Sequence, residues 1–255
     1  MLFSAKSDVG SVRQRNEDAF FAESFPEPPF FFAVADGMGG HAGGEEAAQL
    51  AIEILQEAFL NWRLKVQIPA GAGPSEAPRE FLVQNLRLAN SRILAAARVL
   101  GKDGMGTTFS SALFWQGRLH LAHVGDSRIY LFRSDRLTRL TEDHSLVGEL
   151  VRNGSLSEEE ALVHPQRHVL TEALGTQPEA RIDLQEVEVG EGDTFLLCTD
   201  GLTNLVAEPR LAALLQREPL EELTTRLIEE AITNGGHDNI TVVVFRLEVR
   251  DFKTS

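Results

Sequence analysis

Apolar residues recur at every third or fourth position in two long stretches of the N-terminal half. The first stretch runs from about Glu45 to Trp62, and the second from about Arg79 to Leu100. This spacing is typical of amphipathic helices that cover a core. Two more helices are predicted further on. Ser157 and Glu160 form a capping-box pattern that opens a short one, and the other occupies about residues 220–234.

Short apolar runs between these helices are predicted to be β-strands. They are Phe30–Ala35, Phe109–Trp115, Arg118–Val124, Ile129–Arg133, Thr194–Cys198 and Ile240–Leu247. Gln116-Gly117 and Ser134-Asp135 lie where tight turns between neighbouring strands are expected. The strands come in consecutive groups separated by pairs of helices. This order favours an α+β fold in which helices pack outside antiparallel sheets.

The chain is expected to form one domain over residues 1–255, with a core at about 2–248. The nearest thing to a linker is Ile68–Pro78, which is rich in proline, glycine and alanine. It lies between two predicted helices, so a surface loop within one domain is expected there. The hydrophobic content of 43% is enough to bury a sizeable core.

The net charge of −14 limits the partners of the protein. So acidic a surface repels nucleic acids and anionic lipids, and neither is expected as a main partner. No run of about 18 apolar residues exists, and the N-terminus lacks the pattern of a secretion signal, so no membrane span is predicted. Cys198 is the only cysteine, which excludes an internal disulfide and suits a cytoplasmic location.

Aspartates recur beside the predicted strands. The segments FFFAVADGMGG, LHLAHVGDSR, TFLLCTDGL and GGHDNITVVVF contain Asp36, Asp126, Asp200 and Asp238, and a fifth aspartate, Asp18, precedes another short apolar run. Aspartate is disfavoured in strands and accepted in turns. Strands that lie side by side would bring these turns together at one edge of a sheet.

Carboxylates that converge in space repel one another unless a cation lies among them. Mg²⁺ and Mn²⁺ prefer oxygen ligands, whereas the chain has no HExxH or CxxC pattern for zinc. Each aspartate taken alone is better explained as a turn or helix-cap residue. The joint occurrence, with Gly37, Gly201 and Asn239 following three of them, favours a site for Mg²⁺ or Mn²⁺.

Two other enzyme classes fit the sequence less well. GMGGHA at residues 37–42 satisfies a dinucleotide-binding pattern, but Asp36 directly before it would repel a pyrophosphate. Cys198 follows a predicted strand, as a nucleophile could. The loop after it contains no arginine to hold a phosphate, and Asp200 and Glu208 would raise the pKa of its thiol. A small buried residue is the better interpretation.

With these residues assembled, the chain resembles the type 2C metal-dependent Ser/Thr protein phosphatases, especially the compact bacterial members. The matching segments are SDVGSVRQRNEDAF (7–20), VADGMGGHAGGEEAA (34–48), MGTTFSSALF (105–114), HVGDSRIYLF (123–132), LLCTDGL (196–202) and HDNITVVVF (237–245). Six segments in the same order over almost the whole chain are a specific match.

The resemblance implies a central sandwich of two antiparallel β-sheets, flanked on both sides by pairs of α-helices. It also implies a dinuclear Mn²⁺ or Mg²⁺ site at one end of that sandwich. By similarity, Asp36 bridges both ions, and the carbonyl group of Gly37 binds one of them. Asp200 and Asp238 match ligands of the other ion.

The remaining site residues are also assigned by this resemblance. Asp18, with Glu17 beside it, is similar to an acidic pair that acts near the second ion through water. Asp126 is similar to a ligand of a third, weaker ion in bacterial relatives, which Asp200 shares. Arg13 matches the guanidinium that binds the substrate phosphate.

The chain departs from many eukaryotic members at position 38, where methionine replaces a histidine proposed to protonate the leaving group. His41 is the nearest substitute. Both His41 and His237 could donate a proton or contact substrate, or could be ordinary polar loop residues. Residues 144–175 correspond to a flap near the site that varies within the family, so no roles are transferred there.

The implied reaction is hydrolysis of phosphoserine and phosphothreonine in proteins by a hydroxide that bridges the metals, without a covalent enzyme intermediate. Implied partners are phosphorylated proteins, including a Ser/Thr kinase and its targets, and a monomer is expected. Two alternatives stay open. One is a pseudophosphatase that binds a phosphorylated partner without turnover, and the other is an enzyme for small phosphoesters.

Overall fold

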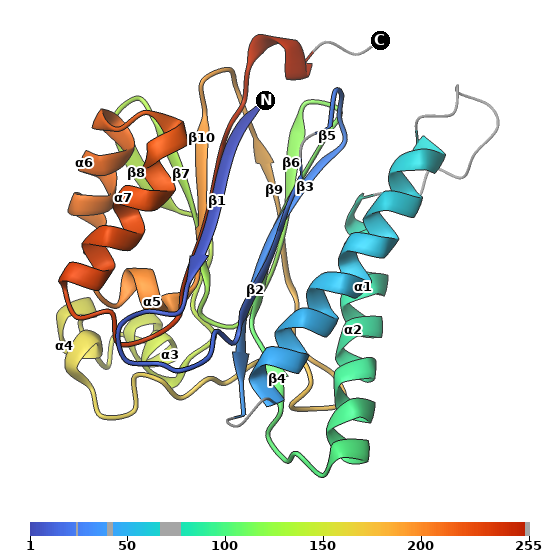
Figure 1. Ribbon diagram of the computed structural model, residues 1–255, viewed down its shortest axis with the longest axis vertical. Helices are drawn as coiled ribbons and strands as arrows, with labels where there is room; N and C mark the ends of the chain where they lie inside the picture. The colour runs from blue at the N-terminus through green and yellow to red at the C-terminus, as the bar shows by residue number, and fades with distance from the viewer. Residues whose placement is uncertain (24, 40–42, 67–77, 253–255) are drawn as a thin grey trace.

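The computed structural model describes residues 1–23, 25–39, 43–66 and 78–252, and two antiparallel sheets lie at its centre (Figure 1). The first sheet has the order β1 (Leu2–Asp8), β11 (Ile240–Arg246), β10 (Thr194–Cys198), β7 (Arg128–Arg133) and β8 (Arg136–Arg139). The second has the order β2 (Asp18–Ala22), β3 (Phe30–Met38), β5 (Phe109–Trp115), β6 (Arg118–Val124) and β9 (Asp183–Glu188), and β4 (Gly106–Thr107) pairs with the end of β3.

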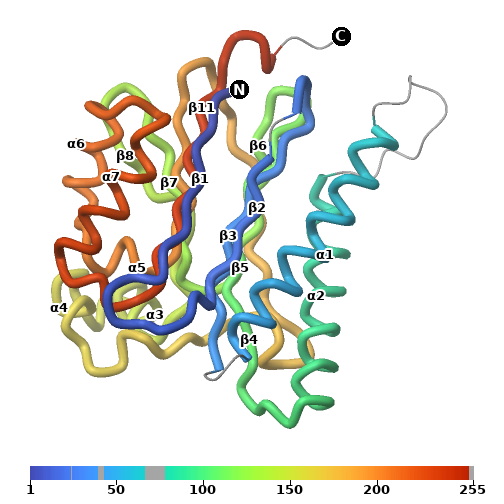
Figure 2. The backbone as a smooth tube through the Cα atoms, viewed as in Figure 1, coloured from blue at the N-terminus to red at the C-terminus, as the bar shows by residue number. Residues whose placement is uncertain are grey.

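Helices cover the outer face of each sheet. The long helices α1 (Gly43–Val66) and α2 (Pro78–Leu100) lie over the second sheet, and α6 (Glu208–Arg217) and α7 (Leu220–Thr233) lie over the first (Figure 1). Four short helices complete the fold: α3 (Leu146–Arg152), α4 (Glu158–Val163), α5 (Asp200–Thr203) and the 3₁₀ helix η1 (Val249–Phe252). The predicted sandwich with helical pairs on both sides is therefore confirmed. β1 and β11 lie side by side in the first sheet (Figure 2).

Alternation along the strands divides the apolar side chains among three layers. On β3, Phe30 and Phe32 point between the sheets, whereas Phe31 points toward α1 and α2. On β11, Val243 and Phe245 enter the same central layer. The rings of Phe32 and Phe245 stack across it with centroids 4.4 Å apart, so aromatic packing joins the two sheets.

Most of the predicted elements are present with nearly the expected bounds. Both predicted tight turns are hairpins with positive φ at two successive residues, at Gln116-Gly117 and at Ser134-Asp135. Ser157 and Glu160 form the predicted capping box at the start of α4. The sequence did not predict the strands β1, β4, β8 and β9 or the helices α3, α5 and α6. β1, β8 and β9 are edge strands whose residues are half-buried or exposed, so they lack the apolar runs that mark the central strands.

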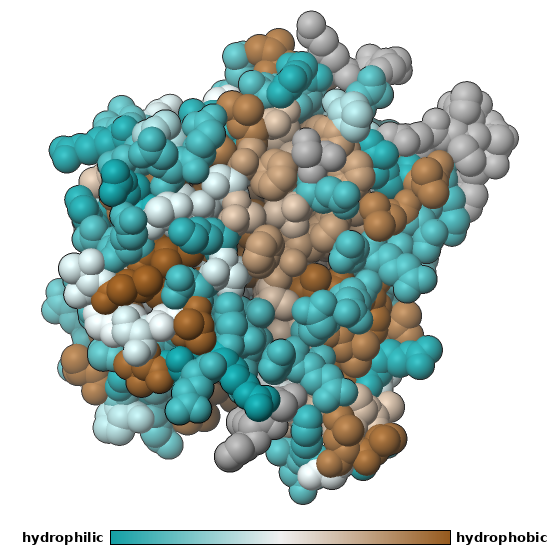
Figure 3. All heavy atoms as spheres, viewed as in Figure 1, coloured by the Kyte–Doolittle hydropathy of each residue, from teal (hydrophilic) through white to brown (hydrophobic). Residues whose placement is uncertain are grey.

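The surface is mostly polar over the helices, and apolar side chains gather over the edge of the sandwich between the two helical layers (Figure 3). Phe3, Ala5, Phe20 and Ala22 are partly buried against the central layer from β1 and β2. None of the helices in the described ranges has both the length and the apolar character that crossing a membrane requires. Residues 68–77 of the predicted surface loop lie outside the described residues.

The central aromatic layer should contribute strongly to stability. Phe245 stacks on Phe32 and also on Phe195, whose ring centroid is 5.0 Å away, and it is fully buried. Phe245→Ala would leave a cavity between the sheets. We expect it to lower the free energy of unfolding by about 3–5 kcal/mol in urea denaturation, whereas Phe245→Leu should cost clearly less. A loss below about 1 kcal/mol for the alanine variant would mean that the layer repacks freely.

Candidate active site

The five aspartates singled out in the sequence come together at one end of the sandwich. Asp18 begins β2 and pairs in register with Asp36 on β3. Asp126 lies in the turn between β6 and β7, Asp200 begins α5 directly after β10, and Asp238 lies just before β11. The charge of Asp36 interacts with those of the other four, so strand ends from both sheets contribute to one cluster.

Burial and mutual repulsion disfavour the charged forms of these carboxylates. Burial is the main cause that raises the pKa of Asp18, to about 7, and it raises the pKa values of Asp36, Asp126 and Asp200 as well. The neighbouring aspartates add to each of these shifts. The four residues nevertheless keep some exposed surface, so water or a small ion can reach them.

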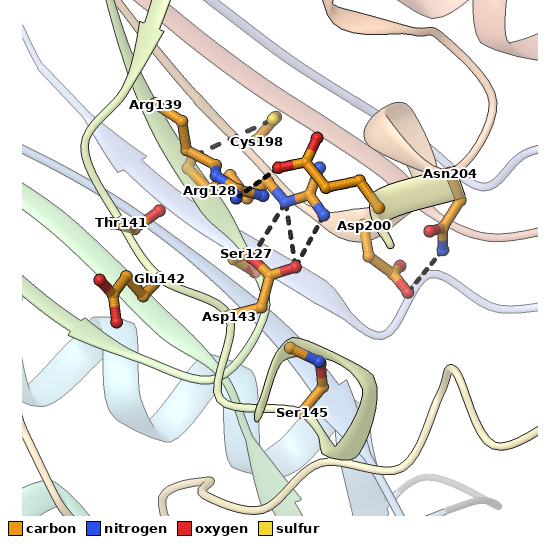
Figure 4. Close-up of polar contacts among 12 residues, drawn as sticks. Ser127, Arg128, Arg139, Thr141, Glu142, Asp143, Ser145, Cys198, Asp200 and Asn204 are labelled. Atoms are coloured by element: carbon orange, nitrogen blue, oxygen red, sulfur yellow. Dashed lines mark hydrogen bonds and ion pairs between the residues drawn. The ribbon is translucent and has the colours of Figure 1, made fainter. Parts of the chain in front are cut away.

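Neutral donors relieve part of this repulsion. The hydroxyl group of Thr199 donates a hydrogen bond to Oδ2 of Asp18 at 2.9 Å and accepts one from the backbone N–H of Thr241 at 3.0 Å. The side-chain amide of Asn204 donates to Oδ2 of Asp200 at 2.9 Å (Figure 4). Within the described ranges, the buried Oδ1 atom of Asp18 has no hydrogen-bond partner. A buried carboxylate oxygen without a donor is a natural ligand for a cation.

Asp36 and Asp200 also act on each other. Besides burial, the charge of Asp200 is one of the causes that raise the pKa of Asp36. A divalent cation beside the two carboxylates would offset this repulsion, so the donor set suits Mg²⁺ or Mn²⁺.

The protein side chains do not complete a coordination sphere by themselves. Over the described ranges, no three His, Cys, Asp or Glu side chains are arranged so as to hold one ion. Mg²⁺ usually keeps several water ligands and binds through one or two carboxylates. The cluster therefore fits ions whose remaining ligands are water and backbone carbonyl groups.

Glycines allow the backbone to approach closely beside Asp36. A Cβ atom on Gly37 would lie 2.1 Å from the carbonyl oxygen of Gly44, and one on Gly44 would lie 2.4 Å from Oε2 of Glu17. The N-terminal turn of α1 therefore lies directly against the end of β3. The backbone of Asp36 is fixed as well, because its N–H donates to Oγ1 of Thr108 at 2.9 Å and its carbonyl accepts from Thr107 and Thr108.

Arg13 lies at this cluster, as the sequence predicted, on the loop between β1 and β2. Its Nη2 atom donates to Oδ2 of Asp238 at 2.9 Å, and its side chain is 53% exposed. The buried side chain of Asn239 holds this loop by accepting from the N–H of Glu17 and donating to the carbonyls of Val9 and Arg15. A guanidinium group on an anchored loop, open to solvent, is well placed for an anionic substrate.

The histidines differ in what the structure shows. His41 lies outside the described residues, so its predicted role is not tested. His237 is exposed beside Asp238, and His123 is buried with its pKa lowered to about 4 by burial and by His144, as expected for a structural residue. His168, between α4 and β9, was not singled out in the sequence. Its charge acts on Asp200 and lowers the pKa of that carboxyl.

Cys198 is not a nucleophile in this fold. It is fully buried in the layer under α6 and α7, and burial raises the pKa of its thiol to about 12. A thiol with so high a pKa carries almost no thiolate at neutral pH. The sequence-based preference for a small buried residue is confirmed.

The chain belongs to the protein phosphatase 2C family. A sequence model described as "Protein phosphatase 2C" matches residues 10–236, and the fold and the carboxylate cluster agree with the resemblance found in the sequence. The predicted enzyme class, a protein-serine/threonine phosphatase, is confirmed by the names of its relatives.

Close relatives cover nearly the whole chain. The serine/threonine phosphatase stp of Listeria innocua is 37% identical over 94% of this chain and 93% of its own length. The crystal structure of the serine/threonine phosphatase PstP/Ppp of Mycobacterium tuberculosis is 40% identical, with a TM-score of 0.84, and the match covers 97% of this chain and 98% of that one. A structure of the catalytic domain of PstP with two manganese ions is 38% identical, with a TM-score of 0.81, over 95% of this chain and 96% of that one.

The raised pKa values predict how the stability of the metal-free protein varies with pH. A carboxyl group whose pKa is higher in the folded state stabilises the fold below its unfolded pKa, about 3.9, and loses that contribution as the pH rises through the folded value. For Asp18 this loss extends to about pH 7. The neutral variant Asp18→Asn lacks the group, so its melting temperature should rise relative to wild type as the pH increases from about 5 to 7.

Thermal unfolding in EDTA at several pH values measures this difference. Mn²⁺ should raise the melting temperature of the wild-type protein, and more at pH 7 than at pH 5, since metal binding competes with protons. A constant difference between wild type and Asp18→Asn over this range would contradict the shifted pKa.

Proposed function

We propose that the chain hydrolyses phosphoserine and phosphothreonine in proteins with Mn²⁺ or Mg²⁺, without a covalent enzyme intermediate. The observation that carries this proposal is the cluster of five aspartates beside Arg13. Burial and mutual repulsion raise four of the carboxyl pKa values, and one buried oxygen has no hydrogen-bond partner among the described residues. Cations would offset the repulsion in such a cluster, and the positive charge of an arginine at its rim would attract an anionic ligand. The relative PstP, crystallised with two manganese ions, supports the choice of metal.

We take the ligand assignments from the family resemblance. Asp36 would serve both ions, the carbonyl of Gly37 one of them, and Asp200 and Asp238 the other. Among the described residues no three such side chains surround one point, so these three aspartates would have to move closer together to share an ion. By the family resemblance, Asp18 would act near the second ion, largely through water. Thr199 binds its Oδ2 atom, and the unpartnered Oδ1 atom stays available for that contact. A third ion at Asp126 and Asp200 is proposed because the two carboxylates repel each other in the structure.

The bound cations would neutralise the phosphoryl charge and lower the pKa of a bound water, which supplies the nucleophile. The residues of the chain bind and orient the substrate. Arg13 pairs with Asp238 in the structure. Its two terminal N–H groups can bind two phosphoryl oxygens and stabilise the charge that spreads over them in the transition state.

The leaving alkoxide needs a proton, and two histidines are candidates for donating it. His41 is proposed from the sequence alone. His168 is supported by its interaction with Asp200 and by its exposed side chain.

We further propose that residues 1–255 act as one catalytic domain with a flap at 144–175. The flap is tied to the body at both ends, since His144 bonds to Gly125 and Leu174 bonds to Thr107 through the backbone. Phosphorylated proteins, including a Ser/Thr kinase and its targets, are the proposed partners. A role in signalling, a monomeric state and a cytoplasmic location stay predictions.

The deciding experiment measures phosphate release from a phosphothreonine peptide, with a phosphotyrosine peptide and small phosphate esters as competitors. We expect turnover of the phosphothreonine peptide with Mn²⁺, none in EDTA, and recovery on adding Mn²⁺. Asp36→Asn should lower kcat by roughly a hundredfold or more, because it removes charge from the bridging position.

Three outcomes would contradict this function. Turnover that survives EDTA would exclude the metal mechanism. Binding of the phosphopeptide without release of phosphate would identify a pseudophosphatase. A strong preference for small esters over the peptide would mean that proteins are not the main substrates.

Arg13 is expected to act mainly in substrate binding. Arg13→Ala should raise KM for the phosphopeptide by about tenfold or more, while Arg13→Lys should retain part of the affinity as a single point charge. Steady-state kinetics at saturating Mn²⁺ measures both. Arg15→Ala is a matched control on the same exposed loop. Unchanged kcat and KM in Arg13→Ala would remove this residue from the site.

A further inference from the structure

The segment just before the flap is bonded, almost residue by residue, to the turn that carries Asp126. The N–H of Leu140 donates to the carbonyl of Ile129 at 2.8 Å, and Oγ1 of Thr141 accepts from the N–H of Ile129 at 3.1 Å. Nε2 of His123 lies 3.0 Å from the carbonyl oxygen of Glu142. Residues 140–142 therefore run alongside the turn between β6 and β7.

An ion pair reinforces this contact. Arg128, two residues after Asp126, binds the carboxylate of Asp143 through two nitrogens, with Nη2 2.7 Å from Oδ2 (Figure 4). The pair is mostly buried. Burial raises the pKa of Asp143, but the bonds and charge of Arg128 outweigh this effect and hold the pKa below its ordinary value. Two-pronged pairs of this kind fix orientation as well as distance.

His144 holds the turn at its other end. Its backbone N–H donates to the carbonyl of Gly125 at 2.7 Å, and its ring nitrogen Nδ1 accepts from the N–H of Gly125 at 3.3 Å. Because Nδ1 accepts, the ring proton lies on Nε2, which donates to Oδ2 of Asp183 on β9 at 3.0 Å. The ring is only 1% exposed, so these two contacts define its position.

The opposite side of the turn is equally confined. Gly125 has φ of +107°, and a Cβ atom there would lie 2.6 Å from the side chain of Thr108. Thr108 accepts from the N–H of Asp36 and shares a hydrogen bond of 2.7 Å with Ser127. The turn carrying Asp126 is thus held between His144 on one side and the residue that fixes Asp36 on the other.

We propose that His144, oriented by Asp183, is a positioning residue that fixes the turn of Asp126 and so sets how tightly the site binds its weakest metal ion. The proposal rests on the proposed metal-dependent function. His144 also begins the flap, because its carbonyl accepts from the N–H of Thr171 and Ser145 caps α3. His144 therefore connects the first residues of the flap to the turn that carries Asp126.

The test compares variants that remove the two ring contacts separately. His144→Leu removes both, whereas His144→Asn keeps an acceptor near the position of Nδ1 and should retain the bond to Gly125. Asp183→Ala removes the group that orients the ring, while Asp183→Asn keeps an acceptor for Nε2. Two controls keep both ring contacts of His144. Arg181→Gln removes the ion pair that Arg181 forms with both oxygens of Asp183, and His120→Asn changes a histidine on β6 that faces Glu186.

Binding of Mn²⁺ is measured by electron paramagnetic resonance titration, and phosphate release is measured over the same range of Mn²⁺. We expect His144→Leu and Asp183→Ala to weaken the weakest Mn²⁺ site roughly tenfold to a hundredfold, as is usual when the partner of a ligand is lost. KM for the phosphopeptide at saturating Mn²⁺ should change less than about twofold, because Arg13 and its loop are untouched. His144→Asn and Asp183→Asn should recover most of the affinity.

The two hypotheses fail in different ways. A wild-type protein that binds Mn²⁺ but releases no phosphate would overturn the proposed function. The Mn²⁺ affinities of the variants would still test the role of His144, because they do not depend on phosphate release. Affinity for Mn²⁺ within about twofold of wild type in a folded Asp183→Ala protein would overturn the positioning role. Asp183 is 36% exposed, so this variant should fold even if His144→Leu does not.

Discussion

Repulsion among buried carboxylates is the constraint on which the active end of this molecule depends. Aspartates at five strand ends are forced together by the closing of the sandwich, and burial makes their charges costly. Neutral donors at Thr199 and Asn204 and the guanidinium groups of Arg13 and Arg128 offset part of this cost. These are too few to neutralise the cluster, which leaves protons or metal ions to complete it.

The site spans both sheets, so its geometry depends on how the sheets pack. Asp18 and Asp36 belong to the second sheet, Asp200 and Asp238 follow or precede strands of the first, and the turn of Asp126 crosses between them. The hydrogen bond from Thr199 to Asp18 also crosses this gap. The distances among the carboxylates are therefore set by the same aromatic layer that stabilises the sandwich.

The sequence predicts the apolar strands and long helices well because burial imposes regular spacing on them. It also identifies the aspartates, since each lies beside a strand in a polar turn. It does not reveal why Asn239 or Thr199 matters, because their partners lie 222 and 181 positions away. The same holds for His144, whose partner Asp183 lies on an edge strand without an apolar pattern.

Backbone hydrogen bonds behind the carboxylates give the strand ends a defined shape. Thr107 and Thr108 hold the backbone of Asp36, and Asn239 holds the loop that carries Arg13. The positions of these two segments therefore do not depend on the charges of the carboxylates. The turn of Asp126 is held in the same way by the segment before the flap. Because backbone contacts fix these segments, the carboxylates are not needed to hold them in place, and a cation that binds there relieves the repulsion among them.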